Sequence, residues 1–362
     1  MFSGALPILG FIGLLVSIVV IHEAGHFFMA KLFKVKVLEF GIGFPPRLAS
    51  ITRGGTRYSI NLIPLGGFCK MLGEEDPSHS GSLAGKSPGV RFLILAAGPF
   101  MNLILTVALF SLLFLIPQDV PVGDVSVTDV IADSPASKGG VLAGDIILEA
   151  NGQTLKTDLD LRYQIALSDG EEMTWLSRRA GNDLIVKVIP RIKPPEGEGA
   201  TGIRVVTQNI ELEERSVGIP RALFLGVSQT GQVLVLAKNE IGYWLSAGRA
   251  PEVAGPVGMA QVFGEGAQAE DISLKNRILT TISLAALISL SLSIFNFLPI
   301  PALDGGRILF VGIEWIRRGK RIPPQKEGLV HLFGFALLIT LAILITVEDI
   351  GRVLRGESFF GG

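Results

Sequence analysis

The sequence predicts a polytopic α-helical membrane protein with about four transmembrane helices and an inserted β-rich domain. The mean hydropathy is +0.50, and 48% of the residues are hydrophobic. A bilayer of roughly 30 Å needs about 20 apolar residues per span. Strand-like alternation between the second and third apolar stretches predicts the β-rich domain. The expected spans cover residues 6–30, 92–116, 278–298 and 329–347.

The composition excludes several classes of protein and site. The 362 residues carry a net charge of −1, which does not provide the basic surface that nucleic-acid binding needs. Cys69 is the single cysteine, so an internal disulfide and a cysteine-rich metal site are both excluded. We expect Cys69 to be a small packing residue, with a reactive thiol as the alternative.

The first apolar stretch contains the sequence His22-Glu23-Ala24-Gly25-His26. Glu23 is its only acidic residue, and ionisable groups at membrane depth mark functional sites. On a helix, His22 and His26 share one face, so both imidazoles can reach one metal ion with Glu23 beside them as a base. The alternative is a pair of packed histidines, one of them paired with Glu23. No Lys or Arg precedes the stretch, so we interpret it as a retained membrane helix and not as a signal peptide.

The third apolar stretch ends in a segment that a continuous helix cannot accommodate. It reads NFLPIPALDGG from Asn296 to Gly306, and its two prolines break the helix. Irregular backbone at membrane depth is tolerated only where it is buried in protein or lines a cavity. Asp304 follows and can supply a carboxylate ligand, so that two histidines, one carboxylate and a water would form a catalytic zinc site. The alternative is an ordinary helix-end loop with a capping aspartate.

The segment between the second and third spans predicts a compact β-rich domain. Residues 122–131 alternate like a strand, Asn151-Gly152 closes a second strand in a hairpin turn, and residues 159–167 have helical spacing. The pattern SPA…GV…GDIIL…NG resembles a PDZ domain over residues 120–192. A small β domain without a peptide groove is the alternative.

Residues 193–276 are expected to form a linker followed by an amphipathic or interfacial region. The Pro/Gly/Glu-rich linker is expected to run from Lys193 to Gly202. Residues 221–247 combine helical spacing with interspersed polar side chains, which predicts an interfacial helix; a fifth span is the alternative. The sequence GPVG at 255–258 is expected to form a structural turn, with a gating role as the alternative.

Together, HExxH in the first span and NxxPxPxLDGG after a late one resemble the site-2 protease family of intramembrane zinc metalloproteases. The resemblance implies a membrane domain at 1–118, the PDZ domain and linker region, and a membrane domain at 277–362 with the LDGG motif. It also implies one zinc ion per chain, held by His22, His26 and Asp304, with Glu23 moving a proton from the attacking water to the leaving amine.

Four further residues are substrate-binding candidates through the same resemblance. Asn296 matches the family asparagine that holds the substrate backbone near the metal. Asn102, in the sequence GPFMN, is expected either to position the substrate or to bond a neighbouring helix. Gly41 and Gly43 belong to segments that resemble a membrane-dipping β-hairpin, which could capture an extended substrate by β-addition. A purely structural hairpin is the alternative.

The resemblance implies cleavage of transmembrane segments in single-span proteins that another protease has already cut, such as anti-sigma factors or remnant signal peptides. The positive-inside rule predicts that loops 31–91 and 306–328 are cytoplasmic, and the number of spans then predicts that the PDZ domain lies outside the cytoplasmic membrane. The PDZ domain would act as a size filter or as a reader of new C-termini. Two rival functions are a membrane-anchored PDZ scaffold without protease activity and a protease that acts on soluble peptides.

Overall fold

The computed structural model describes residues 5–74, 76–195, 197–247, 258–261 and 273–355. The chain divides into two compact units. One comprises residues 1–113 and 253–362, and the other comprises residues 114–252. The predicted region 193–276 includes residues outside the described ranges. The turn predicted at GPVG lies outside them at positions 255–257.

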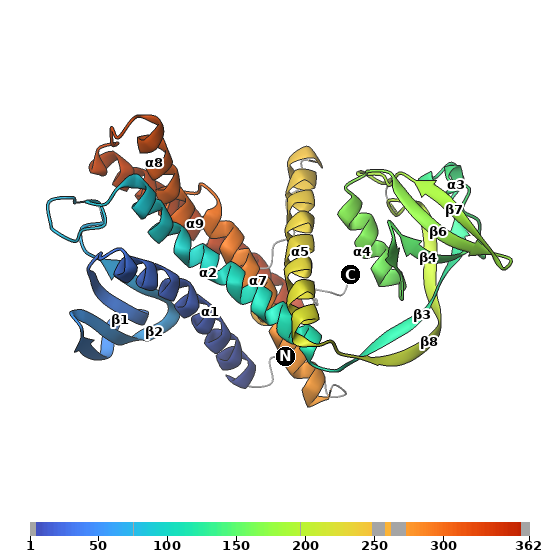
Figure 1. The fold of residues 1–362 in the computed structure, drawn as a ribbon, viewed down its shortest axis with the longest axis horizontal. Coiled ribbons are helices and arrows are strands. Elements are labelled where there is room, and N and C mark those ends of the chain that lie inside the picture. The colour runs from blue at the N-terminus through green and yellow to red at the C-terminus, as the bar shows by residue number, and fades with distance from the viewer. Residues whose placement is uncertain (1–4, 75, 196, 248–257, 262–272, 356–362) are drawn as a thin grey trace. The chain divides into compact units, whose positions relative to one another are not determined.

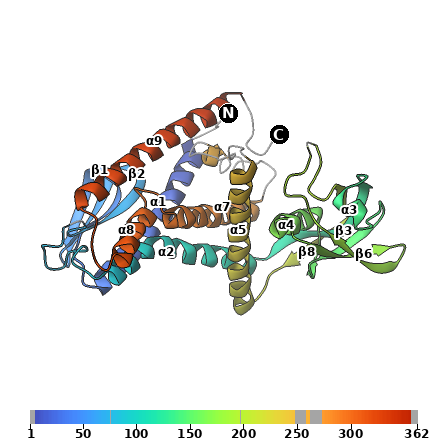
Figure 2. The ribbon, with the colours of Figure 1, turned by 90° about the horizontal axis from the view of Figure 1, so that it is seen from above.

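The first unit contains long apolar helices, and four in the described part are long and apolar enough to cross a membrane (Figures 1 and 2). Their number and approximate positions confirm the prediction of about four spans. In α9 only 6% of the most apolar window is buried inside the protein, which is expected of a helix that faces lipid. The bounds are α1 (Ala5–Leu32), α2 (Pro88–Leu115), α7 (Leu274–Phe297) and α9 (Pro324–Arg355).

Small residues let α1 and α2 approach closely. A Cβ atom on Gly25 would lie 2.3 Å from the carbonyl oxygen of Ala97, so only glycine fits at this crossing. Polar side chains bond α7 to α2. Ser293 donates to the carbonyl oxygen of Pro99 at 2.8 Å, and Ser289 donates to that of Asn102 at 2.9 Å. Such bonds satisfy polar groups that lipid cannot.

A long β-hairpin follows α1 and consists of β1 (Val37–Arg53) and β2 (Thr56–Met71) (Figure 1). Residues 39–42 pair with 67–70 and also with 57–60, so the two strands bend into a broader sheet. Apolar side chains of the hairpin and of the end of α1 form a shared core. Large apolar side chains also remain exposed on the hairpin: Phe44, Leu48, Ile51, Ile60, Leu62 and Ile63.

The helix α8 (Asp304–Ile316) occupies the first part of the segment 306–328, which connects the last two spans, and the sequence did not predict this helix. The first turn of the helix contains Gly305-Gly306, and glycines disfavour a helix when sequence is considered alone. Both glycines are required by packing, because a Cβ on Gly305 would lie 2.0 Å from the carbonyl oxygen of Leu298. Glu314 of α8 is buried and forms ion pairs with Arg91 and Arg321.

The second unit is built on a six-stranded sheet in the order β7-β6-β4-β3-β8, with β5 paired to β4. Its core gathers apolar residues around the fully buried Trp175. Asn151 and Gly152 both have positive φ, at 51° and 74°, which confirms the predicted hairpin turn. The elements are β3 (Gln118–Val130), α3 (Pro135–Lys138), β4 (Ile146–Ala150), β5 (Gln153–Thr154), α4 (Asp158–Ser168), β6 (Met173–Arg179) and β7 (Asn182–Val188).

The sheet continues past residue 192, the predicted end of the β domain. β8 (Ile203–Arg215) pairs with β3 from Gln118 to Val130, so the sheet also includes the residues that directly follow the predicted linker. The acidic residues Glu211, Glu213 and Glu214 hide the alternation that marks the first half of this strand. The predicted helix at 221–247 is confirmed as α5 (Ile219–Ala247), which bonds to α4 through Asn239 and the carbonyl oxygen of Ala166 at 2.9 Å.

The buried carboxylate of Asp145 gives a test of the second unit. It accepts hydrogen bonds from Arg179 at 2.6 and 2.7 Å and from the backbone N–H of Leu142 at 2.9 Å. The Arg179 guanidinium lowers the pKa of Asp145 below its usual value. The stabilisation is therefore present above the unfolded pKa of about 3.9 and is lost as the pH falls through the folded pKa.

We predict that Asp145→Asn lowers the free energy of opening of this sheet by about 2 kcal/mol at pH 7, measured by hydrogen exchange of the β4 and β6 amides in the full-length protein. Asp183→Asn is the matched control. Asp183 pairs with Arg178 on the surface, so its loss should cost much less than the loss of Asp145. Equal effects of the two substitutions would contradict this account.

Candidate metal centre

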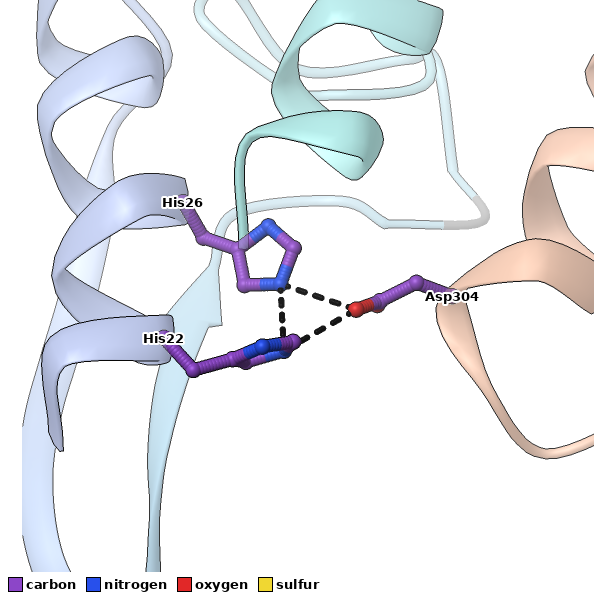
Figure 3. Close-up of side chains that lie close together, drawn as sticks. All are labelled: His22, His26 and Asp304. Atoms are coloured by element: carbon purple, nitrogen blue, oxygen red, sulfur yellow. Dashed lines mark hydrogen bonds and ion pairs between the residues drawn. The ribbon is translucent and has the colours of Figure 1, made fainter. Parts of the chain in front are cut away.

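Two helices from distant parts of the sequence bring three metal-ligand side chains together. His22 and His26 project from α1 toward Asp304, the first residue of α8 (Figure 3). Asp304 Oδ2 lies 3.1 Å from Nε2 of each histidine, and the two Nε2 atoms are 3.3 Å apart. No other group of three His, Cys, Asp or Glu side chains comes this close in the described ranges.

The spacing of these atoms fits a tetrahedral zinc ion. Donor atoms ~2.1 Å from a tetrahedral zinc lie about 3.4 Å from one another, close to the observed 3.1–3.3 Å. Two imidazoles and one carboxylate are also a donor set that leaves a fourth position for water or substrate. The side chain of Asp304 is 17% exposed, against 7% and 6% for the histidines.

The hydrogen bonds of His26 orient its ring for metal binding. Its Nδ1–H donates to the carbonyl oxygen of Ile94 in α2 at 2.8 Å. Because Nδ1 carries the proton, Nε2 has a free lone pair directed at the other two donors. Outer hydrogen bonds of this kind fix the tautomer of metal-binding histidines.

Asn102 provides the corresponding partner for His22. The side chain of Asn102 is fully buried in α2, and its amide group lies 3.3 Å from His22 Nδ1. Its Oδ1 has no hydrogen-bond partner in the described part of the chain. Exchanging the amide oxygen and nitrogen, which preserves the shape, lets Oδ1 accept from Nδ1–H and leaves His22 Nε2 free for a metal. The orphaned oxygen therefore fits a metal at this centre.

The backbone of α2 closes one side of the centre at Gly98. A Cβ atom there would lie 2.3 Å from His26 Nε2 and 2.7 Å from His22 Nε2. These are the two atoms that would face the metal. Glycine at this position therefore creates the space in which the two imidazoles stand.

Glu23 lies beside the three donors without joining them. It follows His22 on α1 and is half-buried. The backbone N–H of Cys69 in β2 hydrogen-bonds its carboxylate, so the hairpin holds this side chain near the centre. A carboxylate placed next to a metal site but outside its ligand set can accept a proton from an attacking water.

The helix that carries Asp304 is tied to the hairpin through an ion pair. Arg307 donates to Glu74 Oε2 at 2.8 Å, and Glu74 Oε1 accepts from the backbone N–H of Met71 at 3.1 Å. This pair leaves no signal in the sequence, because the two residues are 233 positions apart and neither belongs to a motif. Asp304 also gains from its place in the first turn of α8, where the helix dipole favours a carboxylate.

The remaining predicted residues lie in different environments. Asn296 is buried at the end of α7 and donates to the carbonyl oxygen of Leu292 at 2.9 Å. Gly41 pairs on both sides within the hairpin sheet, and the carbonyl oxygen of Gly43 accepts from Asn61 at 3.1 Å. Substrate binding by Asn296, Asn102, Gly41 and Gly43 stays a prediction.

Comparisons with known proteins agree with zinc as the metal. The model of peptidase family M50 matches residues 10–341. A Clostridium acetobutylicum protein named as a candidate zinc metalloprotease is 35% identical over 335 residues, which cover 92% of this chain and 94% of the relative. Zinc metalloprotease RasP of Oceanobacillus iheyensis is 28% identical over an aligned length of 430 residues. The alignment covers 94% of this chain and 97% of the relative.

The contact at Gly98 predicts that Gly98→Ala weakens zinc binding by at least about tenfold, because the added Cβ displaces both imidazoles. The measurement is a competition titration of the metal-free full-length protein with a zinc chelator. Gly89→Ala in the same helix is the control, since a Cβ on Gly89 meets nothing within 4 Å. Unchanged zinc affinity in Gly98→Ala would show that α2 does not define the centre.

Proposed function

The chain belongs to peptidase family M50, the zinc metalloproteases of the site-2 type, and from this we propose that it is an intramembrane endopeptidase that cleaves transmembrane segments of single-span proteins. The convergence of His22, His26 and Asp304 carries the proposal. Both histidines lie in α1, whose residues 9–32 are apolar and long enough to cross a bilayer. A hydrolytic centre on such a helix acts within the hydrophobic layer, where the peptide bonds of a membrane segment lie.

The proposed chemistry divides the work between the ligands and Glu23. Zinc bound by the three donors would supply a Lewis acid that polarises the scissile carbonyl and acidifies the attacking water. Glu23 takes a proton from that water and delivers it to the leaving amine. The N–H of Cys69 keeps the Glu23 carboxylate in place for both transfers.

The outer edge of residues 67–71 is the proposed site of substrate capture. These residues pair with β1 alone in the described structure, and Cys69 at their centre contacts Glu23. A substrate segment that unwinds and adds to this edge would bring its backbone beside the catalytic base. Gly41 and Gly43 then support the hairpin from within, and Asn296 at the end of α7 is proposed to hold the substrate backbone. The exposed apolar side chains of the hairpin suit insertion into lipid.

We further propose that the second unit is a PDZ domain that selects substrates outside the cytoplasmic membrane. Loops 31–91 and 306–328 would then be cytoplasmic, with the short helix α8 within the latter. Supporting this, residues of α4, α5 and the beginning of β8 line a pocket of about 510 Å³, a volume within the usual range of ligand-binding pockets. Substrates would be proteins already shortened by another protease, such as anti-sigma factors or remnant signal peptides, and the domain would exclude or bind their outer parts.

A membrane-anchored scaffold without activity is less well supported, because every donor and the base are present with suitable spacing. Glu23→Gln separates the two functions. We predict that it lowers cleavage of a truncated single-span substrate in reconstituted vesicles by about 10²- to 10⁴-fold, with zinc retained at about one per chain. Glu172→Gln, on the surface of the second unit, should cleave normally. Cleavage by Glu23→Gln at the normal rate would contradict the assigned base.

Substrate selection is tested by excising residues 118–215. Gln118 and Arg215 are paired in the sheet, so a short linker can join the flanking residues. The shortened protein is expected to cleave full-length and truncated substrates at similar rates, whereas the intact protein cleaves only the truncated form. Continued rejection of the full-length substrate, by a variant that still cleaves the truncated one, would argue against a filter.

A further inference from the structure

His331 of α9 contacts the loop that carries Asp304. The backbone N–H of Ala302 donates to His331 Nδ1 at 2.8 Å. Ala302 lies two residues before Asp304 and has a φ of +79°, a left-handed conformation that residues other than glycine rarely adopt. A hydrogen bond to a side chain from another helix therefore holds the backbone where it is strained.

The surroundings of His331 restrict movement of both the ring and the loop. One helical turn further along α9, a Cβ on Gly334 would lie 2.4 Å from Pro301 Cβ and 2.7 Å from the carbonyl oxygen of Pro301. The ring of Phe310 in α8 lies with its centroid 5.5 Å from that of His331. The imidazole thus stands between the loop and the helix that Asp304 begins.

The hydrogen bond also shows which ring nitrogen of His331 holds the backbone of the loop. Nδ1 accepts, so it carries a lone pair and the ring is neutral. Nε2 points elsewhere, 3.9 Å from Glu327 Oε1 on the preceding turn of α9. An asparagine can place an oxygen near the position of Nδ1, whereas a glutamine places one near Nε2. Substitutions can therefore test each side of the ring separately.

We propose that His331 is a positioning residue for the metal centre: its Nδ1 fixes the strained turn at Ala302 and thereby sets Asp304 Oδ2 at the distance that His22 and His26 require. The proposal rests on the proposed zinc site. It assigns no contact with metal or substrate to His331 itself, which acts through the backbone of the loop. Outer-shell partners of this kind typically change metal affinity 10- to 100-fold.

The test measures zinc affinity of the metal-free full-length protein in detergent, by chelator competition, together with the absorption spectrum after Co²⁺ loading. His331→Leu is expected to weaken zinc binding about 10- to 100-fold and to change the Co²⁺ spectrum. His331→Asn should restore most of the affinity, and His331→Gln should not. Leu332→Ala, an exposed neighbour on the same helix, should match the wild type.

Repeating the measurement in a protein that also carries Ala302→Gly separates a positioning role of His331 from general damage to the fold. Glycine adopts positive φ without strain, so Ala302→Gly makes the turn less dependent on its hydrogen bond. His331→Leu should therefore weaken zinc binding less in the Ala302→Gly background than in the wild type, which is a coupling between the two positions. Simple misfolding caused by His331→Leu would lower affinity equally in both backgrounds.

Three outcomes would overturn the proposal. The first is that His331→Leu binds zinc with wild-type affinity. The second is that His331→Gln, and not His331→Asn, restores the zinc affinity. The third is that His331→Leu weakens zinc binding equally in the wild-type and Ala302→Gly proteins. Failure of the proposed function is distinguishable, because it would show as normal zinc binding without cleavage of any membrane substrate. The affinity measurements would still decide the role of His331.

Discussion

Two imidazoles and a carboxylate must meet at 3.1–3.3 Å inside an assembly of apolar helices, and much of the first unit follows from this requirement. One helical face supplies both histidines, but the carboxylate comes from 278 residues beyond the second of them. Helix backbones must therefore approach closely enough for short side chains to touch. Gly25 and Gly98 allow that approach, and any side chain at either position would occupy space already filled by backbone or by an imidazole.

A second consequence is that polar atoms near the centre need partners from the protein. Ser289 and Ser293 of α7 bond to backbone carbonyls of α2, and His26 bonds to another carbonyl of the same helix. Arg307 connects the ligand-bearing helix α8 to Glu74 after the hairpin. Each bond relieves the cost of a polar group at low dielectric and also fixes the relation of two elements. Satisfaction of buried polar groups and precision of the metal site are thus the same structural problem.

The features that sequence predicted are those encoded within short segments. Apolar length identified the spans, the four-residue spacing of His22 and His26 identified one half of the centre, and the prolines before Asp304 marked the other half. Contacts between distant segments left no such signal. Gly98 reads as an ordinary helix residue until its distance from His26 is known. α8 and β8 were hidden because glycines and acidic residues at their ends oppose the local propensity that tertiary packing then overrides.

The division of the chain into two units explains how the proposed substrate selection can be separate from the proposed catalysis. Every donor, the candidate base and every side chain that orients them belong to the first unit, and none comes from residues 114–252. The sheet of the second unit begins at Gln118 and ends at Arg215, which are paired neighbours. The chain therefore leaves the sheet close to where it entered it. An insertion with adjacent ends imposes little strain on the helices that flank it. Changes in the second unit that alter the proposed substrate selection can therefore leave the metal-ligand distances, which α1, α2 and α8 hold, unchanged.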